Sequence, residues 1–578
     1  MASQQTTTGE ILPPEERKIL ILYGSETGNS HDFSIDLETM AERLRFRADV
    51  FAIDAITLRL VQLGANEFYP RGEADERHDD GIDGAFLPWL ISLRSHLLSE
   101  YPLPEGLSPI PQDVPLSPKI IIGRDSVLTK DDTNQTNHSK SIDQKGLNGQ
   151  KASPGQVQAA LRNGEDDDDD IIENGIKNFQ FEDALSNTNM CQDDLLPIPD
   201  SWTATVECND RVTPEGHWQD VRQLKLNIHP RPESEDKFCN DAGDSIVIYP
   251  KNFPEDVQEL IDLMGWNDVA DEPFRHYTQR DGALIRDYTP PDCYPVANIR
   301  FYASDPMHKE RLDEFSDPKF IDEFYDYTTR PRRSILEILP DFPSLKIPYQ
   351  HVPGIFPLIR GREYSMASAG ELTLPKSRSA GDVHVELLVA LVKYKTVLRK
   401  IRRGLCSRYI ESLHAGSQIN ITLNRRGGPF IQNKNIIERP LLCIATGTGV
   451  APIRAVFWER HRESSHGPDH LFYGARNEKA DFFFKDEWSK LDIQVHTAFS
   501  RDQREKIYVQ DIIRQQSDLI CTLIKTQATV AICGSSGAMP QAVKSVIAEV
   551  MVQGGIVEPD VDAWEYLVRN NVVWEEVW

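Results

Sequence analysis

Two regions of the chain alternate short, uniformly apolar segments with longer amphipathic ones. Near the N-terminus, the apolar residues 18–23 lead into a hydroxyl-rich turn, a helical stretch to about residue 47 and a second apolar segment at 50–53. From residue 440 onward the alternation resumes, with predicted strands at 441–445, 470–474, 494–500 and 530–533 and predicted helices at 452–462 and 539–553. Apolar strands that alternate with helices are typical of parallel sheets buried on both faces. The pattern therefore predicts a doubly wound α/β domain near each end of the chain.

The middle of the chain has a different pattern, in which polar and apolar residues alternate one by one. This alternation predicts strands at 202–208, 222–228, 243–250, 364–367 and 383–394. A period of two is typical of antiparallel strands that have one buried face. Between these strands, residues 255–265 and 305–340 have mostly helical patterns. We therefore expect an antiparallel β-barrel that contains a helical insert.

Residues 104–200 show neither pattern. Prolines cluster near its start, polar residues and glycine dominate 124–164, and Asp166–Asp170 form an unbroken acidic run. Such a composition cannot bury enough apolar surface to fold alone. We expect an acidic flexible linker here, and a disordered polar tail over residues 1–17. The acidic run lacks the spacing of an EF-hand, which favours a solvated tether over a calcium site.

Composition narrows the classes of function. A chain of 578 residues has room for three or four domains, and its net charge of −27 argues against nucleic acid or an anionic membrane as a partner. No run of about 18 apolar residues is present to span a bilayer, and the first twenty residues lack a signal-peptide core. The eight cysteines are scattered without a C-x-x-C pair. This spacing predicts reduced thiols in a cytosolic protein and no metal site.

Three short segments carry candidate chemistry, and their order matters. Arg362-Glu363-Tyr364-Ser365 offers a guanidinium for a phosphate and a ring for a flat cofactor. The Gly-rich turn 447–452 follows a predicted strand, where a dinucleotide can approach the backbone and a helix N-terminus. Trp578 offers a terminal aromatic ring that can lie over a cofactor and move away. Each segment alone also has a non-functional explanation. The first fits a strand edge, the second a simple βα turn and the third a residue without a role. Together they predict a site that passes electrons between two stacked rings.

A second candidate site is the turn after the first strand. It presents hydroxyl groups and backbone N–H groups at a helix N-terminus, which suits a phosphate. The candidate residues are Ser25, Glu26, Thr27, Gly28, Asn29 and Ser30. The turn lacks the Gly-Lys-Ser/Thr of a P-loop, which argues against a nucleoside triphosphate. A plain helix-capping turn remains the alternative.

Five segments give the chain a specific resemblance: Ile21–Asn29, Arg330–Glu337, Gly404–Ser407, Phe472–Asn477 and Ser500–Gln503. With the linker, the barrel and the terminal Trp, they resemble the diflavin reductases of the cytochrome P450 reductase class, most closely the NADPH-dependent diflavin oxidoreductase 1 family. The resemblance covers residues 18–103 in part and 200–578 throughout. It implies a multidomain α/β protein: a partial flavodoxin-like FMN domain at 18–103, a linker at 104–200, an FAD-binding barrel with a helical insert at 201–439 and an NADP-binding α/β domain of the ferredoxin–NADP reductase type at 440–578.

The resemblance also implies the residues that bind FAD. Arg362 would bind an FAD phosphate, Tyr364 would stack on the isoalloxazine and Ser365 would lie near the flavin N5. The other matching FAD positions are Arg332, Glu363, Gly404, Leu405, Cys406 and Ser407, and Trp578 would cover the flavin ring. The segment 404–407 would present a helix N-terminus to the pyrophosphate.

The NADP positions and the residues around hydride transfer follow from the same resemblance. The NADP positions are Thr448, Ser500, Arg501, Lys506, Ile507, Tyr508, Val509 and Gln510. A hydroxyl, a guanidinium and an ammonium suit a dianionic 2′-phosphate, and so they select NADPH over NADH. Cys533 and Glu576 match the thiol and the acid beside the transferred hydride, with Ser365 and Trp578 as the other catalytic candidates. The bland alternatives are a buried strand-end thiol and a solvated tail carboxylate.

The flavodoxin-like region departs from the family pattern. After residue 53 the chain runs almost directly into 59–64, which matches a late helix, so two central strands and roughly sixty to seventy residues are missing from a doubly wound domain. The two loops that hold the FMN ring are missing with them, and Glu76 is a weak remaining FMN position. A splice or gene-model variant explains the gap, and so does a reductase that has lost its FMN half.

The resemblance implies an enzyme that passes electrons from NADPH to FAD, then to FMN and to an anamorsin-type Fe–S protein in cytosolic iron–sulfur cluster assembly. The cytoplasm is the expected compartment, with the mitochondrion as a second one considered. Two alternatives stay open: a single-flavin FAD reductase with a vestigial FMN half, and an inactive scaffold that binds an assembly partner through residues 1–200.

Overall fold

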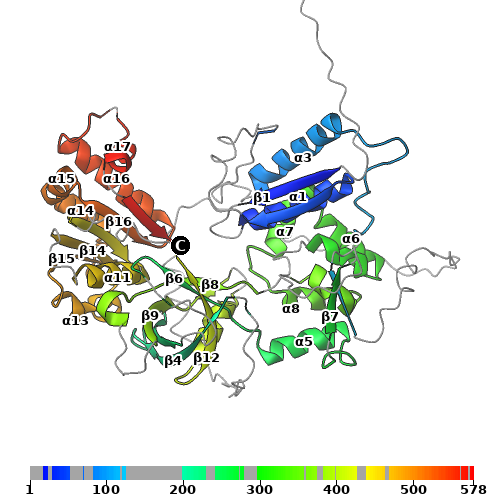
Figure 1. The fold of residues 1–578 in the computed structure, drawn as a ribbon, viewed down its shortest axis with the longest axis horizontal. Helices are drawn as coiled ribbons and strands as arrows, with labels where there is room; N and C mark the ends of the chain where they lie inside the picture. Colours follow the sequence, from blue (N-terminus) through cyan, green and yellow to red (C-terminus); the bar gives the residue numbers. More distant parts are fainter. Residues whose placement is uncertain are drawn as a thin grey trace, which may run out of the picture. The chain divides into compact units, whose positions relative to one another are not determined.

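The computed structural model describes residues 17–23, 29–52, 69–70, 83–116, 120–124, 198, 200–229, 238, 241–272, 274–278, 296–356, 359–373, 382–396, 399–425, 438–461, 468–559, 561–570 and 573–578. The chain divides into two compact units (Figure 1). The N-terminal unit comprises residues 1–164, 252–359 and 396–398, and the C-terminal unit comprises 165–251, 360–395 and 399–578. Each is described below by itself.

The N-terminal unit begins with a small α/β element. Strand β1 (Lys18–Tyr23) pairs in parallel with β2 (Arg47–Ala52), and the helices α1 (Asn29–Arg43) and α3 (Asp83–Glu100) complete it. Its apolar core includes Ile21, Leu44, Leu93 and Leu97, so both helices pack on the strands. Among the residues described, this sheet has two strands. The predicted strand–helix–strand order is confirmed, although β2 starts three residues earlier than the pattern indicated.

The start of the expected linker is attached to this unit. The backbone N–H of Ile110 donates to the carbonyl of Arg43, and the side chains of Arg43 and Arg45 donate to the carbonyls of Val114 and Ser108. Strand β3 (Ile120–Arg124) then pairs antiparallel with β7 (Phe274–Thr278) of the helical insert. The structure differs here from the predicted linker because three consecutive isoleucines have a high preference for strand. Residues 125–197 lie outside the described part of the chain.

The helical insert was expected at 255–265 and 305–340 and is found there. Its helices are α5 (Pro254–Met264), α6 (Pro306–Glu314), α7 (Ile321–Tyr327) and α8 (Ile335–Ile338). Asp305 caps α6 by accepting from the N–H groups of Met307 and His308 at 2.8 and 3.3 Å. Residues from all four helices and the following segment build one core, which includes Met264, Leu312, Ile338, Phe342 and Leu345.

The C-terminal unit opens with an antiparallel six-stranded sheet. Its order is β8-β6-β12-β4-β5-β9 (Arg362–Ser365, Ser245–Ile248, Gln418–Asn424, Trp202–Arg211, Val221–Ile228 and Val383–Ala390). A bridge between Met366 and Leu387 joins the two outer strands, so the sheet is nearly closed into the predicted barrel. A hairpin of β10 (Lys393–Lys395) and β11 (Ile401–Arg403) leads to helix α9 (Leu405–Ser412), whose Cys406, Tyr409 and Ile410 pack into the barrel core.

The rest of this unit is a parallel five-stranded sheet. Its order is β15-β14-β13-β16-β17 (Ile493–Phe499, Asp469–Ala475, Leu441–Thr446, Thr529–Gly534 and Val573–Val577). One face packs on α11 (Val450–His461) and α13 (Lys485–Trp488), and the other on α14 (Val509–Gln515), α15 (Ser517–Lys525), α16 (Ala538–Gln553) and α17 (Ala563–Asn570) (Figure 1). This is the doubly wound domain predicted from the sequence.

The edge strand β17 was not predicted. All five of its residues pair with β16, and Cys533 lies opposite Glu576 in the parallel register. The last residues of the chain are therefore held in a sheet and do not form a free tail. Among the described helices, none is both long and apolar enough to cross a bilayer.

Candidate functional site

The predicted FAD residues of strand β8 lie alternately on its two faces. Tyr364 is half-buried, and its hydroxyl donates to the Sγ of Cys406 at 3.3 Å. Burial raises the pKa of the Tyr364 phenol, and burial also raises the pKa of the Cys406 thiol, so both groups stay protonated near neutral pH. The exposed guanidinium of Arg362 lies near this pair, and so its positive charge partly opposes the rise of both pKa values. Arg362, Tyr364 and Cys406 are thus brought together as the sequence predicted.

Helix α9 presents an uncapped N-terminus beside these residues. Its N-cap is Gly404, which supplies no side-chain hydrogen bond to the first amides. Ser407 does not cap the helix either, because its Oγ accepts from the N–H of Val392 at 2.8 Å. A Cβ at Gly404 would come within 3.2 Å of Ser407 Oγ and 3.3 Å of Val392 Cβ. The amides at residues 405–407 are therefore suited to an anion such as a pyrophosphate.

Glu363 and Arg332 are placed differently from their neighbours in the predicted set. The carboxylate of Glu363 accepts hydrogen bonds from Ser245 Oγ and from Asn424 Nδ2, and so it joins β8 to β6 and β12. This geometry indicates a role in holding the strands. Arg332 lies in the N-terminal unit, in the turn between α7 and α8, with a left-handed φ of 48°. Its role at FAD stays a prediction.

The predicted hydride-transfer residues meet where the barrel adjoins the parallel sheet. The hydroxyl of Ser365, at the end of β8, donates to the carboxylate of Glu576 on β17. Cys533 is the next-to-last residue of β16, opposite Glu576, and its side chain is fully buried. Burial raises the pKa of the Cys533 thiol well above its ordinary value, and the Glu576 carboxylate raises it further. Three residues from distant parts of the sequence thus form a cluster of a hydroxyl, a carboxylate and a neutral thiol.

Trp578 follows the last residue of β17 and lies two residues beyond Glu576. Its N–H donates to the carbonyl of Gly534 at 3.1 Å, and its carbonyl accepts from Ser536 at 2.9 Å. The side chain is 51% exposed. The backbone is therefore fixed while the ring is open to solvent, which suits a ring that covers a cofactor and is displaced.

Deletion of Trp578 should narrow the discrimination between NADPH and NADH. A stacked aromatic contact contributes about 0.5–1.5 kcal/mol, so the Trp578 ring competes with the nicotinamide for the flavin. NADH, which binds more weakly than NADPH, gains most when this ring is removed. Stopped-flow hydride transfer from NADH should become faster, and release of oxidised nucleotide slower. Tyr566→Ala, which removes an exposed ring on α17 of the same domain, is the control. Unchanged kinetics with both nucleotides after the deletion would show that Trp578 does not cover the flavin.

The Gly-rich turn is held unusually close to the neighbouring strand. It forms one helical turn, Gly447–Gly449, between β13 and α11. A Cβ on Gly449 would lie 2.4 Å from the carbonyl oxygen of Cys533, so only glycine fits. The buried Tyr473 supports the turn from below, because its hydroxyl donates to the carbonyl of Gly447 at 3.2 Å. The half-buried Thr448 is thereby placed at the carboxyl ends of the central strands, where α/β domains bind dinucleotides.

The predicted 2′-phosphate residues lie on loops at the same edge of the sheet. The N–H of Ser500 donates to the carbonyl of Ala475, the last residue of β14, at 2.9 Å, and that of Arg501 donates to the carbonyl of Arg476 at 2.8 Å. Lys506 and Tyr508 are exposed, and Tyr508 is the N-cap of α14. Ile507 and Gln510 are half-buried, and Val509 is 2% exposed within the apolar core. The structure therefore gathers the hydroxyl, the two cations and the ring on an accessible edge, while Val509 contributes to the core.

The predicted FMN residues lie mostly outside the described part of the chain. Ser25, Glu26, Thr27, Gly28 and Glu76 are not described. Asn29 and Ser30 open helix α1, although their side chains are not described. The expected FMN site thus stays a prediction. Among the described residues, no group of three or more His, Cys, Asp or Glu side chains is arranged to hold a metal ion.

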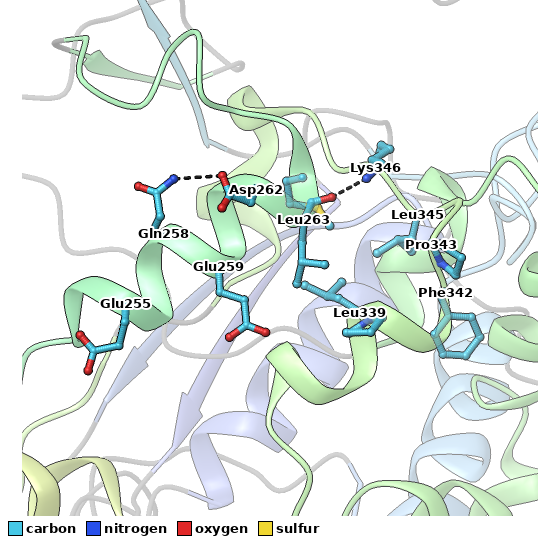
Figure 2. Close-up of a pocket in the computed structure, with 12 residues that line it drawn as sticks. Glu255, Gln258, Glu259, Asp262, Leu263, Leu339, Phe342, Pro343, Leu345 and Lys346 are labelled. Atoms are coloured by element: carbon cyan, nitrogen blue, oxygen red, sulfur yellow. Dashed lines mark hydrogen bonds between the residues drawn. The ribbon is translucent and has the colours of Figure 1, made fainter. Parts of the chain in front are cut away.

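An open hollow of 610 Å³ lies elsewhere, in the helical insert between α5 and residues 339–346 (Figure 2). Glu255, Glu259 and Asp262 line its α5 side, and Lys346 donates to a carbonyl at the end of α5. Figure 2 shows the three carboxylates spaced along one helix. Their charge disfavours a phosphate-bearing cofactor. None of the predicted site residues lines this hollow.

Sequence reasoning missed a buried arginine at the same site. Arg454 lies on α11, five residues after Gly449, and is 2% exposed. Its guanidinium donates to the carbonyl of Ala367, two residues after Ser365, at 2.6 Å. A charged residue inside the apolar run Val450–Trp458 was the signal that could have identified it.

FAD and NADPH fit the groups that the C-terminal unit presents. The uncapped α9 N-terminus and Arg362 suit a pyrophosphate, and Tyr364 offers a ring for stacking. The glycine turn and the loop of Ser500 and Arg501 suit a phosphorylated dinucleotide.

Comparisons with known proteins agree with this geometry. The FAD binding domain family model matches residues 202–409, and the oxidoreductase NAD-binding domain model matches residues 443–545. Several relatives bear the name NADPH-dependent diflavin oxidoreductase 1. That of Aspergillus fumigatus is 42% identical over 86% of this chain and 76% of its own length. That of Emericella nidulans is 37% identical over 93% and 92%, and that of Gibberella zeae is 35% identical over 98% and 100%.

The alignments also show that the relatives are longer. The alignment with the Gibberella zeae protein spans 654 positions, whereas this chain has 578 residues, so at least 76 positions face a gap in this chain. Identity of this extent over nearly the whole of both chains establishes the relationship. The chain belongs to the NADPH-dependent diflavin oxidoreductase 1 family.

Proposed function

We propose that the chain is an NADPH-dependent flavoprotein oxidoreductase that delivers electrons to an anamorsin-type Fe–S protein in cytosolic iron–sulfur cluster assembly. The observation that carries the enzymatic part is the cluster of Ser365, Cys533 and Glu576, which joins the FAD-type barrel to the nucleotide domain. The acceptor and the cytoplasmic location, with the mitochondrion as a second compartment, rest on the resemblance to the family.

Each residue of the cluster has a distinct task. When bound, FAD accepts the hydride of NADPH and supplies the redox chemistry. Ser365 presents its hydroxyl at the end of β8 and is oriented by the Glu576 carboxylate. Cys533 stays a neutral thiol because burial raises its pKa, so it adds no negative charge to the place where a hydride must pass. The Trp578 ring shields this place from water until a nicotinamide displaces it. Holding two rings in a reactive geometry is how such a site accelerates the reaction.

A single-flavin reductase is the second candidate, and two observations favour it. The described part of the N-terminal α/β element has a two-stranded sheet, whereas a doubly wound domain needs central strands to bury both helical layers. At least 76 aligned positions of the Gibberella zeae relative have no counterpart in this chain, from 654 aligned positions against 578 residues, and this total exceeds the length of two strands with their connections. In this form FAD passes electrons directly to the acceptor.

Flavin content distinguishes the candidates. We expect the purified full chain to hold close to one FAD and much less than one FMN, measured by heat release and separation of the flavins. Arg362, Tyr364 and Cys406 of the expected FAD set lie close together, whereas the loops that hold an FMN ring in the family are missing from the sequence. Equimolar FMN would contradict the expected loss. A chain without a flavin band that NADPH bleaches would instead support the inactive scaffold that binds a partner through residues 1–200.

A further inference from the structure

The guanidinium of Arg454 joins the nucleotide domain to the barrel. Its Nε and Nη2 donate to the two carboxylate oxygens of Glu487 at 2.7 and 2.9 Å, which anchors it within the nucleotide domain. Its Nη1 donates to the Ala367 carbonyl at 2.6 Å and to the Glu386 carboxylate at 3.0 Å, both in the barrel. The ring of Phe484 lies 4.2 Å from the guanidinium carbon. One rigid, planar group thus connects both domains.

The barrel groups that Arg454 contacts are themselves bonded to one another. The N–H of Ala367 donates to the Glu386 carbonyl at 2.7 Å, and the N–H of Glu386 donates to Ser368 Oγ at 2.9 Å. Burial alone would raise the pKa of the Glu386 carboxyl, but the charges of Arg454 and Lys225 hold it below its ordinary value. Glu386 therefore stays ionised at neutral pH, and the contact persists.

The location of these contacts connects them to the chemistry. Ala367 follows Ser365 by two residues, and Arg454 follows the turn of Thr448 and Gly449 by one helical turn. The apolar core around Ala367, Val450 and Phe457 also spans the two domains. Apolar burial is non-directional, however, so it brings the domains together without fixing their register. Directed hydrogen bonds to a carbonyl and two carboxylates do fix it.

We propose that Arg454 is a positioning residue for hydride transfer, which sets the distance between the strand that carries Ser365 and the turn that carries Thr448. The inference rests on the proposed function for its kinetic consequence. The placement of the strand itself can be measured without any turnover.

The chain offers a matched control on the same helix. Arg460 is also buried on α11, at 3% exposed, and it forms a bidentate pair with Asp469 at 2.8 and 3.1 Å. Asp469 lies on β14, and the Arg439 carbonyl, to which Arg460 Nη2 also donates at 3.0 Å, lies two residues before β13, so neither contact reaches a barrel strand. Arg454→Lys and Arg460→Lys therefore remove the same kind of fork and keep the charge. Only the first disturbs the contact with the barrel.

The test compares both variants as full chains. In Arg454→Lys, the rate at which saturating NADPH bleaches the flavin should fall by about tenfold to a hundredfold, because small displacements of reacting groups carry such costs. The dissociation constant of NADPH should change much less, and the isotope effect with deuterated NADPH should rise. Amides of residues 362–369 should exchange hydrogen faster. Arg460→Lys should lower the melting temperature to a similar degree and change neither the bleaching rate nor that exchange.

Glu487→Gln provides a milder variant if Arg454→Lys does not fold, since it keeps the acceptor oxygen and removes the charge. Glu487→Gln should slow bleaching of the flavin and speed hydrogen exchange at residues 362–369, as Arg454→Lys does, but to a smaller extent. Equal slowing in the Arg454 and Arg460 variants would overturn the proposal, and so would unchanged exchange at 362–369 in the Arg454 variant. If NADPH does not bleach the wild-type flavin, the proposed function fails, and the exchange comparison still decides whether Arg454 positions the strand.

Discussion

Replacing Arg501 and Lys506 together by alanine should abolish most of the preference for NADPH over NADH. Each charge-assisted contact to a phosphate contributes about 1.5–3 kcal/mol, so the preference should fall at least about tenfold, and by about a hundredfold if the two contributions add. The loss should appear as a raised KM for NADPH, with NADH nearly unchanged, because NADH has no 2′-phosphate to lose. Steady-state reduction of ferricyanide with each nucleotide measures the ratio.

A charge-matched control is available in the same domain. Arg514 on α14 pairs with Glu549 on α16. Lys525, the last residue of α15, donates to the carbonyl of Gly554, which follows α16. Their joint replacement by alanine removes two positive charges away from the expected phosphate site and should leave the ratio unchanged. If both double variants lower it equally, the preference comes from general electrostatic attraction, and the 2′-phosphate lies elsewhere.

The second large effect is expected at the Ser365–Glu576 hydrogen bond. Ser365→Ala should slow flavin reduction at saturating NADPH by about a hundredfold, in the range found when one preorganised hydrogen-bonding group is removed from a reaction centre. Glu576→Gln should slow it by about tenfold or more, because an amide orients the hydroxyl less strongly than a carboxylate does. The double variant should be little slower than Ser365→Ala, since both changes remove one shared interaction.

The neighbouring residue on the same strand supplies the control. Glu575 points to the opposite face of β17 and pairs with Lys544 at 2.7 Å. Glu575→Gln changes the same charge at the next position and should leave the reduction rate within about twofold of wild type, as a surface ion pair contributes little. If Glu575→Gln and Glu576→Gln slow flavin reduction equally, both changes act by destabilising β17, and Glu576 has no specific role at the reaction centre.

The sequence predicted the two kinds of sheet well because each one repeats a strong local pattern. The buried strand Leu441–Thr446 reads as uniformly apolar, and the barrel strand Val221–Ile228 alternates, so the period alone identifies a parallel or an antiparallel sheet. Strand β17 was missed because its sequence, Val-Trp-Glu-Glu-Val, has two adjacent carboxylates. A polar pattern of this kind is tolerated at a sheet edge, where one side of the strand is open.

The site could be predicted only in part. Ser365 and Glu576 are 211 positions apart, and no periodicity in the sequence indicates that they meet; the resemblance to a family supplied that expectation. Glu363 lies in the same motif as Ser365, yet the alternation of β8 turns it toward Ser245 and Asn424. Arg454 was overlooked because its partners come from three separate segments, at residues 367, 386 and 487. Tertiary contacts of this kind are invisible to any local pattern.

The strand order of the barrel has a consequence for how the chain folds during synthesis. Strand β12 lies between β6 and β4, with Ile421 opposite both Trp202 and Ile248, so the sheet is incomplete until β12 has left the ribosome. At about 5–20 residues per second, the 219 residues from Trp202 to Ile421 take roughly 10–40 s to synthesise. Throughout that time the β4–β5 hairpin presents an open edge, which is a site for mispairing with other chains. The insert, whose core closes by residue 356, is complete before then, and we expect it to fold first.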